Sequence, residues 1–494
     1  MQNKMILAKT ILIYIIILPI IGIFSILLLN PNEKRLIKLL ALNFSCSTFI
    51  GFLFLWAFFD KATAQFQFST KILLSLLLNL NFFIGIDGIS IFFLLLTCLL
   101  IPICLLASWD SIYYNLKEFC IAFLLLNFLL ICVFLVLDIL FFYIFFESIL
   151  IPMFLIIGIW GSRERKILAA YYFFLYTLIG SIVLLIAITY IYSQVGATDY
   201  ETMLTFSFTK FEQKFLWFAF FLSFASKIPM VPFHLWLPEA HVEAPTSGSV
   251  LLAGILLKLG SYGFIRFSLP LFPIASFYFA PLVYTIVVIG VVFTSFTAIR
   301  QTDFKRIIAY TSIAHMNLVI LGIFSFNSIG IQGAIFQSLS HGFVASALFL
   351  IIGVVYDRYK TRLVKYYGGL AIVMPIYVFI FLFFSIANIG FPGTSSFVGE
   401  FLIFLGAFKI NTTITFLSAT SMVIGGGYSL WLFNRICYGN LKIQYTKTFF
   451  DLSYREFITF LPLLLGSLVS GIYPSIFLNS INFSVNYLIE LLYF

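Results

Sequence analysis

Charged residues are scarce in this sequence. Of its 494 residues only 10% are Asp, Glu, Lys or Arg, and 62% are hydrophobic. Soluble domains contain roughly 25% charged residues, so the composition excludes a water-soluble globular protein as well as a disordered chain. The formal net charge of +9 comes from Lys and Arg scattered over short connections. Because basic arms and stripes are absent, we expect no nucleic-acid partner and interpret the basic excess as membrane topology.

Motifs for metals and cofactors are lacking as well. The six cysteines form no C-x-x-C, and none lies at a zinc-like spacing from the four histidines. Glycine-rich phosphate loops, H-E-x-x-H and G-x-S-x-G are also absent. The sequence therefore predicts no metal and no cofactor on this chain. The cysteines are expected to be small buried hydrophobic residues.

Long hydrophobic runs dominate what is present. The hydrocarbon core of a bilayer is about 30 Å thick and needs roughly 20 apolar residues of helix. Runs of this kind, bounded by charges, prolines or glycines, predict an all-α membrane protein with about 14 transmembrane helices. In chain order they are 5–29, 36–59, 87–108, 119–137, 139–160, 167–192, 215–237, 246–267, 277–299, 305–325, 329–355, 370–408, 412–436 and 457–478.

Two apolar stretches are left outside these runs. Residues 72–86 contain asparagines and a glycine, which predicts a buried or hairpin connection. Residues 481–494 are too short to cross a membrane and are expected to lie at its interface.

The basic residues predict an orientation. Connections after odd-numbered runs contain 18 of the 28 Lys and Arg, including Lys305 and Arg362, and the side with both termini contains 8, including Arg266. By the positive-inside rule, both termini then face away from the cytoplasm or matrix.

Helix breakers interrupt runs 7 and 12. They are Pro229 and Pro232 in run 7, and Gly390, Pro392 and Gly393 in run 12. Each proline removes a helix hydrogen bond, and we expect the carbonyls of Ala225, Ile228 and Asn388 to lose their partners. Because the breaks lie five runs apart, runs 4–8 and 9–13 are predicted to be inverted five-helix repeats around broken helices 7 and 12. The predicted domains are 1–118, 119–267, 277–436 and 457–494.

Four charged residues lie deep within the runs, where each costs about 2.5 kcal/mol or more. They are Glu147, Lys227, Lys258 and Glu400. Two acids and two bases suggest pairing inside a bundle, and a pair 4 Å apart gains ~4 kcal/mol at an effective dielectric of 20, which desolvation opposes. Near-balance of these terms allows a proton switch. The alternatives are static ion pairs that fix helix register and lysines that snorkel to the headgroups.

Histidines complete the polar inventory of the runs. His315 and His341 lie within runs 10 and 11, and His234 follows Lys227 by seven residues, which places both on about one helical face. We interpret these histidines as candidate proton relays, the alternative being hydrogen-bonded core residues.

The segment KIPMVPFHLWLPEAHVEAPTSGSVLLAGILLKLGSYG at 227–263 resembles the proton-translocating antiporter-like subunits of respiratory complex I. Matching pieces follow the same order, at 83–90, 300–317, 340–349 and 390–401. The resemblance implies a membrane-arm subunit of NADH:ubiquinone oxidoreductase that moves protons from matrix to intermembrane space. NADH, FMN, iron–sulfur clusters and ubiquinone would be bound by partner subunits. Sister antiporter-like subunits and membrane lipids would be its neighbours, in the mitochondrial inner membrane.

The resemblance also implies roles for the buried residues. Glu147 and Lys227 would be a modulating pair, Lys258 the central lysine and Glu400 the residue at the exit, with His234, His315 and His341 as links through water. Glutamate rather than lysine at 400, and a short tail, separate the chain from other members of the family. The 64 phenylalanines fit AT-rich coding in the mitochondrion. The alternative function is a subunit of a multisubunit cation/proton antiporter without redox partners.

Overall fold

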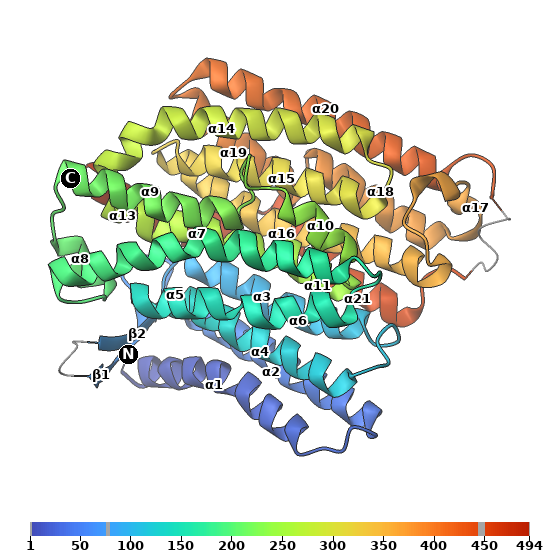
Figure 1. Ribbon diagram of the computed structural model, residues 1–494, viewed down its shortest axis with the longest axis horizontal. Coiled ribbons are helices and arrows are strands. Elements are labelled where there is room, and N and C mark those ends of the chain that lie inside the picture. The colour runs from blue at the N-terminus through green and yellow to red at the C-terminus, as the bar shows by residue number, and fades with distance from the viewer. Residues whose placement is uncertain (1, 76–79, 443–449, 494) are drawn as a thin grey trace.

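The computed structural model describes residues 2–75, 80–442 and 450–493. Long helices lie side by side and run along the long axis of the molecule (Figure 1). The two chain termini lie at the same end of this bundle, and the segment around α17 lies at the opposite end (Figure 1). The prediction of an all-α membrane protein is confirmed.

Twelve helical segments in the described residues are long and apolar enough to cross a membrane. In the first half they are α1 (Gln2–Leu27), α2 (Lys34–Phe58), α3 (Ser90–Ala107), α4 (Leu116–Leu135), α5 with α6 (Ile139–Ser148, Leu150–Trp160) and α7 (Lys166–Val195). In the second half they are the segment from α11 to α13 (Thr246–Leu271), α14 (Pro273–Arg300), α15 (Phe304–Ile323), α16 (Ser328–Tyr359), α20 (Thr412–Cys437) and α21 (Tyr454–Ile472).

Runs 7 and 12 are the two that do not form one continuous helical segment long enough to cross a membrane. Run 7 divides into α9 (Lys210–Lys227) and α10 (Trp236–Glu243), and run 12 into α18 (Pro375–Ile389) and α19 (Ser395–Phe408), after the short α17 (Leu370–Val373). Both divisions occur where the helix breakers predict them. The count of fourteen spans, the inverted repeats and the domain limits stay predictions.

One detail of the first break differs from expectation. The carbonyl of Ala225 does not lose its partner, because the backbone N–H of Met230 donates to it at 3.0 Å. The chain thus closes a wider turn directly after α9 ends. The nearby carbonyl of Ser226 accepts from the indole Nε1 of Trp236 at 2.9 Å, which attaches α10 to the end of α9. This break is therefore a compact, bonded structure rather than an open one.

A two-stranded antiparallel sheet accompanies the helices. Strand β1 (Gln67–Ser75) pairs with β2 (Leu80–Ile86), with Lys71 opposite Phe83. The predicted hairpin connection over 72–86 is present in its described part, although it begins earlier than expected; its residues 76–79 lie outside the described residues. The sheet lies at the end of the bundle that holds both termini (Figure 1).

The C-terminal segment is longer than the sequence predicts. Helix α22 (Ser475–Tyr493) begins directly after Pro474, so it has 19 residues instead of a short tail. One face of it is buried, and the hydroxyl of Ser484 accepts from the N–H of Gly88 at 3.0 Å. The hydroxyl of Tyr493 donates to the carbonyl of Phe326 at 3.3 Å. Helix α22 therefore ties the start of α3 to the connection between α15 and α16.

The centre of the bundle consists of α16 and the segment Thr246–Leu271, both buried along their length, whereas α7 and α20 each expose one face. Within Thr246–Leu271, α11 (Thr246–Leu251) and α12 (Leu257–Gly263) flank a π-helical turn, η1 (Leu252–Leu256), and a second, η2 (Phe264–Ser268), precedes α13 (Leu269–Leu271). Wide turns of this kind are frequent at functional sites. The first one directly precedes Lys258.

A buried chain of ionisable side chains

Lys258 lies at the centre of the bundle and is fully buried. Its Nζ donates to the carbonyl of Ala253 at 2.5 Å, five residues back in the wide turn, and lies 2.8 Å from Nδ1 of His341 on α16. A lysine this deep cannot reach a headgroup, so snorkelling is excluded here. An ammonium donates to Nδ1, which places the proton of a neutral His341 on Nε2.

The chain of groups continues from α16 to α15 and α19. The rings of His341 and His315 have their centroids 5.8 Å apart. Nδ1 of His315 lies 3.0 Å from Oε1 of Glu400, which is 2% exposed. The same oxygen accepts from the amide of Gln337 at 3.1 Å. Four predicted residues, Lys258, His341, His315 and Glu400, thus follow one another across four helices.

A cavity of ≈ 10 Å³ lies beside His315 and Glu400. Its polar lining includes Ser295, Asn388 and Tyr428. A volume of this size is about what one water molecule needs, and these groups supply hydrogen-bond partners for it. The break between α18 and α19 borders the same cavity, so the break places polar groups beside Glu400.

Glu147 and Lys227 form a second, separate pair. Nζ of Lys227 lies 3.9 Å from Oε1 of Glu147, 3.5 Å from the carbonyl oxygen of Phe146 and 4.2 Å from the centroid of its ring. Lys227 is the last residue of α9, and Glu147 lies near the end of α5. At this separation the attraction is ~4 kcal/mol for an effective dielectric of 20. The pair matches the one expected from the sequence.

The two groups of charges are carried by helices that touch. A Cβ on Gly260 would lie 2.5 Å from the side chain of Ile228 and 2.8 Å from the carbonyl oxygen of Phe224, so only glycine allows α12 to approach α9 this closely. Gly260 follows Lys258 by two residues, and Ile228 follows Lys227 by one. Among the described residues, no hydrogen bond or ion pair joins the two lysines directly.

His234 is not where the sequence predicts it. Because α9 ends at Lys227, His234 lies in the connection before α10 and not on a shared helical face. Its ring packs edge-on against Phe293, and its Nδ1 is buried without a hydrogen-bond partner. In the part of the chain that the structure describes, no hydrogen bond or ion pair joins it to Lys227 or Lys258.

The structure also buries charges that the sequence places in exposed connections. We call the end of the bundle opposite the chain termini the basic end, because the connections rich in Lys and Arg lie there (Figure 1). At this end, Nζ of Lys305 donates to the carbonyl of Ala244 at 2.7 Å and to the hydroxyl of Ser249 at 3.3 Å. Nη2 of Arg362 lies 3.5 Å from Oε1 of Glu243, and both side chains are buried. Burial lowers the pKa of the Arg362 guanidinium, and the Glu243 carboxylate opposes this shift.

A third buried pair lies at the opposite end. Nη2 of Arg266 donates to Oδ1 of Asp87 at 2.6 Å, with both side chains 4% exposed. Charges at the ends of the runs are therefore buried in addition to the four that lie deep within them. Charges near the ends of runs are counted as connections by hydropathy, although helix packing covers them.

The structure also places the cysteines and the residue types that could bind a metal ion. Five of the six cysteines are buried and Cys46 is half-buried. Within residues 2–75, 80–442 and 450–493, no group of three or more His, Cys, Asp or Glu side chains is arranged to hold a metal ion.

The fold and this chain of side chains define a multi-span α-helical membrane protein with a buried line of ionisable groups. Residues 136–425 match the family model described as NADH:quinone oxidoreductase/Mrp antiporter, transmembrane. Over 96% of its length the chain is 56% identical to NADH-ubiquinone oxidoreductase chain 4 of Chondrus crispus and 55% identical to that of Arabidopsis thaliana. Each of these alignments also covers 96% of the relative. The chain belongs to the family of NADH-ubiquinone oxidoreductase chain 4 proteins.

A solved structure has the same fold. A chain of respiratory complex I from Thermus thermophilus with bound NADH superposes with a TM-score of 0.88 at 27% identity, covering 97% of this chain and 99% of that one. The resemblance drawn from residues 227–263 is thus confirmed over nearly the whole length of the chain.

Proposed function

We propose that this chain is a membrane-arm subunit of NADH:ubiquinone oxidoreductase and translocates protons from matrix to intermembrane space. Proton movement is coupled to NADH oxidation and quinone reduction, which take place in other subunits. The observation that carries the proposal is the buried succession of Lys258, His341, His315 and Glu400. Intramembrane ionisable groups in sequence are the elements of proton relays.

The geometry supports a direction of transfer between named atoms. The Lys258 ammonium gives a proton to Nδ1 of His341 while the proton on Nε2 of that ring leaves toward His315, with water spanning the gap between the rings. Nδ1 of His315 then delivers a proton to Oε1 of Glu400. A positioned proton-transfer group of this kind contributes about 10²–10⁴ in rate.

Glu147 and Lys227 act as the modulating pair in this proposal. A charge on Glu147 holds the ammonium of Lys227 beside it, and protonating Glu147 removes ~4 kcal/mol of attraction. The ammonium then becomes available to repel a proton on Lys258 across the contact between α9 and α12. His234 has the weakest geometric support of the proposed relay residues, because it contacts neither lysine.

A finer location is part of the proposal. We assign the chain to the mitochondrial inner membrane with both termini on the intermembrane-space side, and its gene to the mitochondrion. The support is the excess of basic residues in connections after odd-numbered runs, together with termini that lie at one end of the bundle (Figure 1). NADH, FMN, iron–sulfur clusters and ubiquinone are assigned to partner subunits.

The second candidate is a subunit of a cation/proton antiporter without redox partners, which the same family model includes. Relatives named NADH-ubiquinone oxidoreductase chain 4 favour the first function. Purification from native membranes distinguishes the two, because an assembly of the second kind contains no subunits that oxidise NADH.

Alanine variants of Lys258 and Glu400 test the proposal in the intact complex. Proton pumping with NADH and a quinone is expected to fall by about 10²-fold or more, because one group of the relay is missing. Electron transfer from NADH to an artificial acceptor is expected to continue, since that reaction takes place in other subunits. Alanine variants that pump at the parental proton ratio would contradict the relay.

A further inference from the structure

The basic end of the bundle contains a polar cavity of ≈ 20 Å³, enough for about one water molecule. It lies between α3, α11, α16 and α21. The polar residues that line it are Thr246, Asp357, Arg455, Glu456 and Thr459. The cavity lies at the opposite end of the bundle from the chain termini and adjoins the start of Thr246–Leu271, the segment that carries Lys258.

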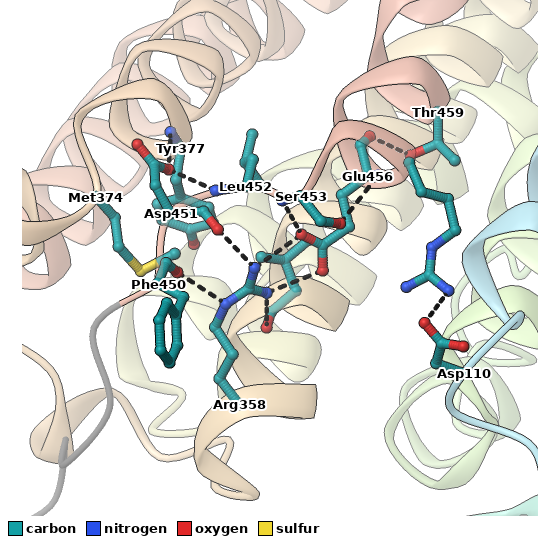
Figure 2. A network of polar contacts seen from close by, with 12 residues as sticks. Asp110, Arg358, Met374, Tyr377, Phe450, Asp451, Leu452, Ser453, Glu456 and Thr459 are labelled. Atoms are coloured by element: carbon teal, nitrogen blue, oxygen red, sulfur yellow. Dashed lines mark hydrogen bonds and ion pairs between the residues drawn. The ribbon is translucent and has the colours of Figure 1, made fainter.

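Two of the charged groups that line this cavity, Glu456 and Arg455, each have an ion-pair partner, and Figure 2 shows the contacts between Glu456 and Arg358. Glu456 accepts two hydrogen bonds from Arg358, at 2.9 and 2.7 Å, and also accepts from the backbone N–H of Ser453 at 2.8 Å. Arg455 is paired with Asp110. Both carboxylates are thus occupied by arginine partners.

Asp357 differs from them. Its carboxylate lines the same cavity, is only partly exposed, and has no hydrogen bond or ion pair within 4.0 Å among the described residues. The charged groups that interact with it are Lys360 and Arg358 at the end of α16, Glu456 on α21 and the buried Lys305 on α15. Asp357 is therefore the cavity carboxylate that is at liberty to gain and lose a proton.

Unpartnered polar atoms lead from this cavity toward Lys258. Ser247 Oγ, both ring nitrogens of His241 and Ser346 Oγ are buried without hydrogen-bond partners. The order in depth of the two serines follows from contacts along α3: the carbonyl of Ser247 contacts Cys104, whereas Ser346 meets Gly254 beside Leu100, one turn farther in. Buried polar groups without protein partners are where water is held in a fold.

Lys305 lies beside this line of groups. Its Nζ donates to Ser249 Oγ, and this hydroxyl in turn donates to the carbonyl of His241. The His241 ring stacks flat on Phe349 at 4.5 Å, which fixes its orientation within α10. The line from Asp357 therefore ends at Ser346, beside Gly254 in the wide turn whose Ala253 carbonyl accepts from Lys258, and Lys305 lies alongside it.

We propose that Asp357 is the proton-collecting group of this chain: it takes protons at the basic end and passes them, through the cavity at Thr246 and the polar line of Ser247, His241 and Ser346, to the Lys258–His341 pair. This inference rests on the proposed function. The step is a transfer of one proton from hydronium to the Asp357 carboxylate and then to water in the cavity, with no other reactant. Asp357 is a residue of proton delivery and acts through the groups that follow it.

Asp357→Asn in the intact complex, sealed into vesicles, tests this proposal with NADH and a quinone as substrates. The asparagine keeps the shape and loses the titratable proton, so the pumping rate is expected to fall about 10²-fold, the lower limit for a positioned proton-transfer group. Added formate, a small weak acid that carries protons into cavities, is expected to restore part of the rate. The matched control is Glu164→Gln, an exposed carboxylate at the same end, which is expected to pump normally.

Pumping of the asparagine variant at the parental rate, or a loss that formate does not restore, overturns the assignment of Asp357. Lys258→Ala is measured in parallel: loss of pumping in that variant with normal pumping in Asp357→Asn leaves the proposed function standing, whereas normal pumping in both contradicts the function itself. If Asp357→Asn fails to assemble, Thr246→Val replaces the cavity hydroxyl by a methyl group. It is expected to slow pumping about threefold, and normal pumping in it also overturns the proposal.

Discussion

Gly390 offers a test of the Glu400 site that leaves every ionisable group in place. Gly390 ends α18 with φ of 81°, and a Cβ built there would lie 2.8 Å from Oε2 of Glu400. Ordinary contact begins at 3.4 Å, so Gly390→Ala must displace the carboxylate by about 0.6 Å. Gly393, in the same break, has φ of 92° and no atom within 4 Å of its Cβ position. Gly393→Ala is therefore the matched control.

The two substitutions share one energetic cost and differ in another. A left-handed backbone costs an alanine roughly 1–2 kcal/mol, and this applies at both positions. Only Gly390→Ala moves Glu400, whose Oε1 lies 3.0 Å from Nδ1 of His315. A displacement of about half an ångström is enough to carry the carboxylate beyond the ~3.2 Å reach within which a proton is passed. A 1 Å misplacement of a reacting group can cost about 10²-fold, so we expect pumping to fall about tenfold.

The assay compares the two variants in vesicles that contain the assembled complex. Proton pumping with NADH and a quinone is divided by NADH oxidation with an artificial acceptor, which corrects for the amount of complex. We expect this ratio to fall about tenfold in Gly390→Ala and to stay near the parental value in Gly393→Ala. Equal ratios in the two variants would refute the reasoning, because they would show that the position of Glu400 does not limit transfer.

Two further predictions concern stability. Glu243→Gln leaves the buried charge of Arg362 unpaired, and removing one partner of a buried pair costs about 3–5 kcal/mol. Thermal inactivation of the complex is therefore expected at a clearly lower temperature. An unchanged midpoint of inactivation would contradict the pairing. Arg358→Gln removes the bidentate bond to Glu456 and is expected to lower the amount of assembled complex seen on native gels. The control is Arg455→Gln, which is expected to change this amount little because the aspartate partner of Arg455 is 66% exposed.

Much of the architecture could be predicted from hydropathy and helix breakers. A membrane span needs about 20 apolar residues, and this requirement is local, so the long helices fall where the runs predict them. The two helix breaks could be predicted in the same way, because Pro229 and Gly390 end helices through the properties of their own backbone. The deep charges Lys258 and Glu400 stood out for the same reason, since each interrupts an apolar run.

His234 shows where a local rule fails beside a break. The seven-residue spacing from Lys227 places two side chains on one face only if the helix continues between them. The prolines that predicted the break also end α9 at Lys227, so the spacing no longer places Lys227 and His234 on one helical face. The same break leads the chain into α10, which brings Glu243 to the basic end opposite Arg362. That pairing depends on the path of the broken segment and leaves no pattern in sequence.

The buried charges at the basic end escape hydropathy for a related reason. Arg300 and Lys305 lie in the same connection, five residues apart, and a hydropathy window treats them alike. Arg300 is exposed. Lys305 is 2% exposed, because the end of α10 covers it and the carbonyl of Ala244 accepts a hydrogen bond from its Nζ. Burying a charge costs several kcal/mol unless hydrogen bonds replace its water, so the covered lysine requires the specific oxygens that it contacts. Its environment is therefore a property of packing between distant segments, and it becomes visible only when α10 and α15 are placed together.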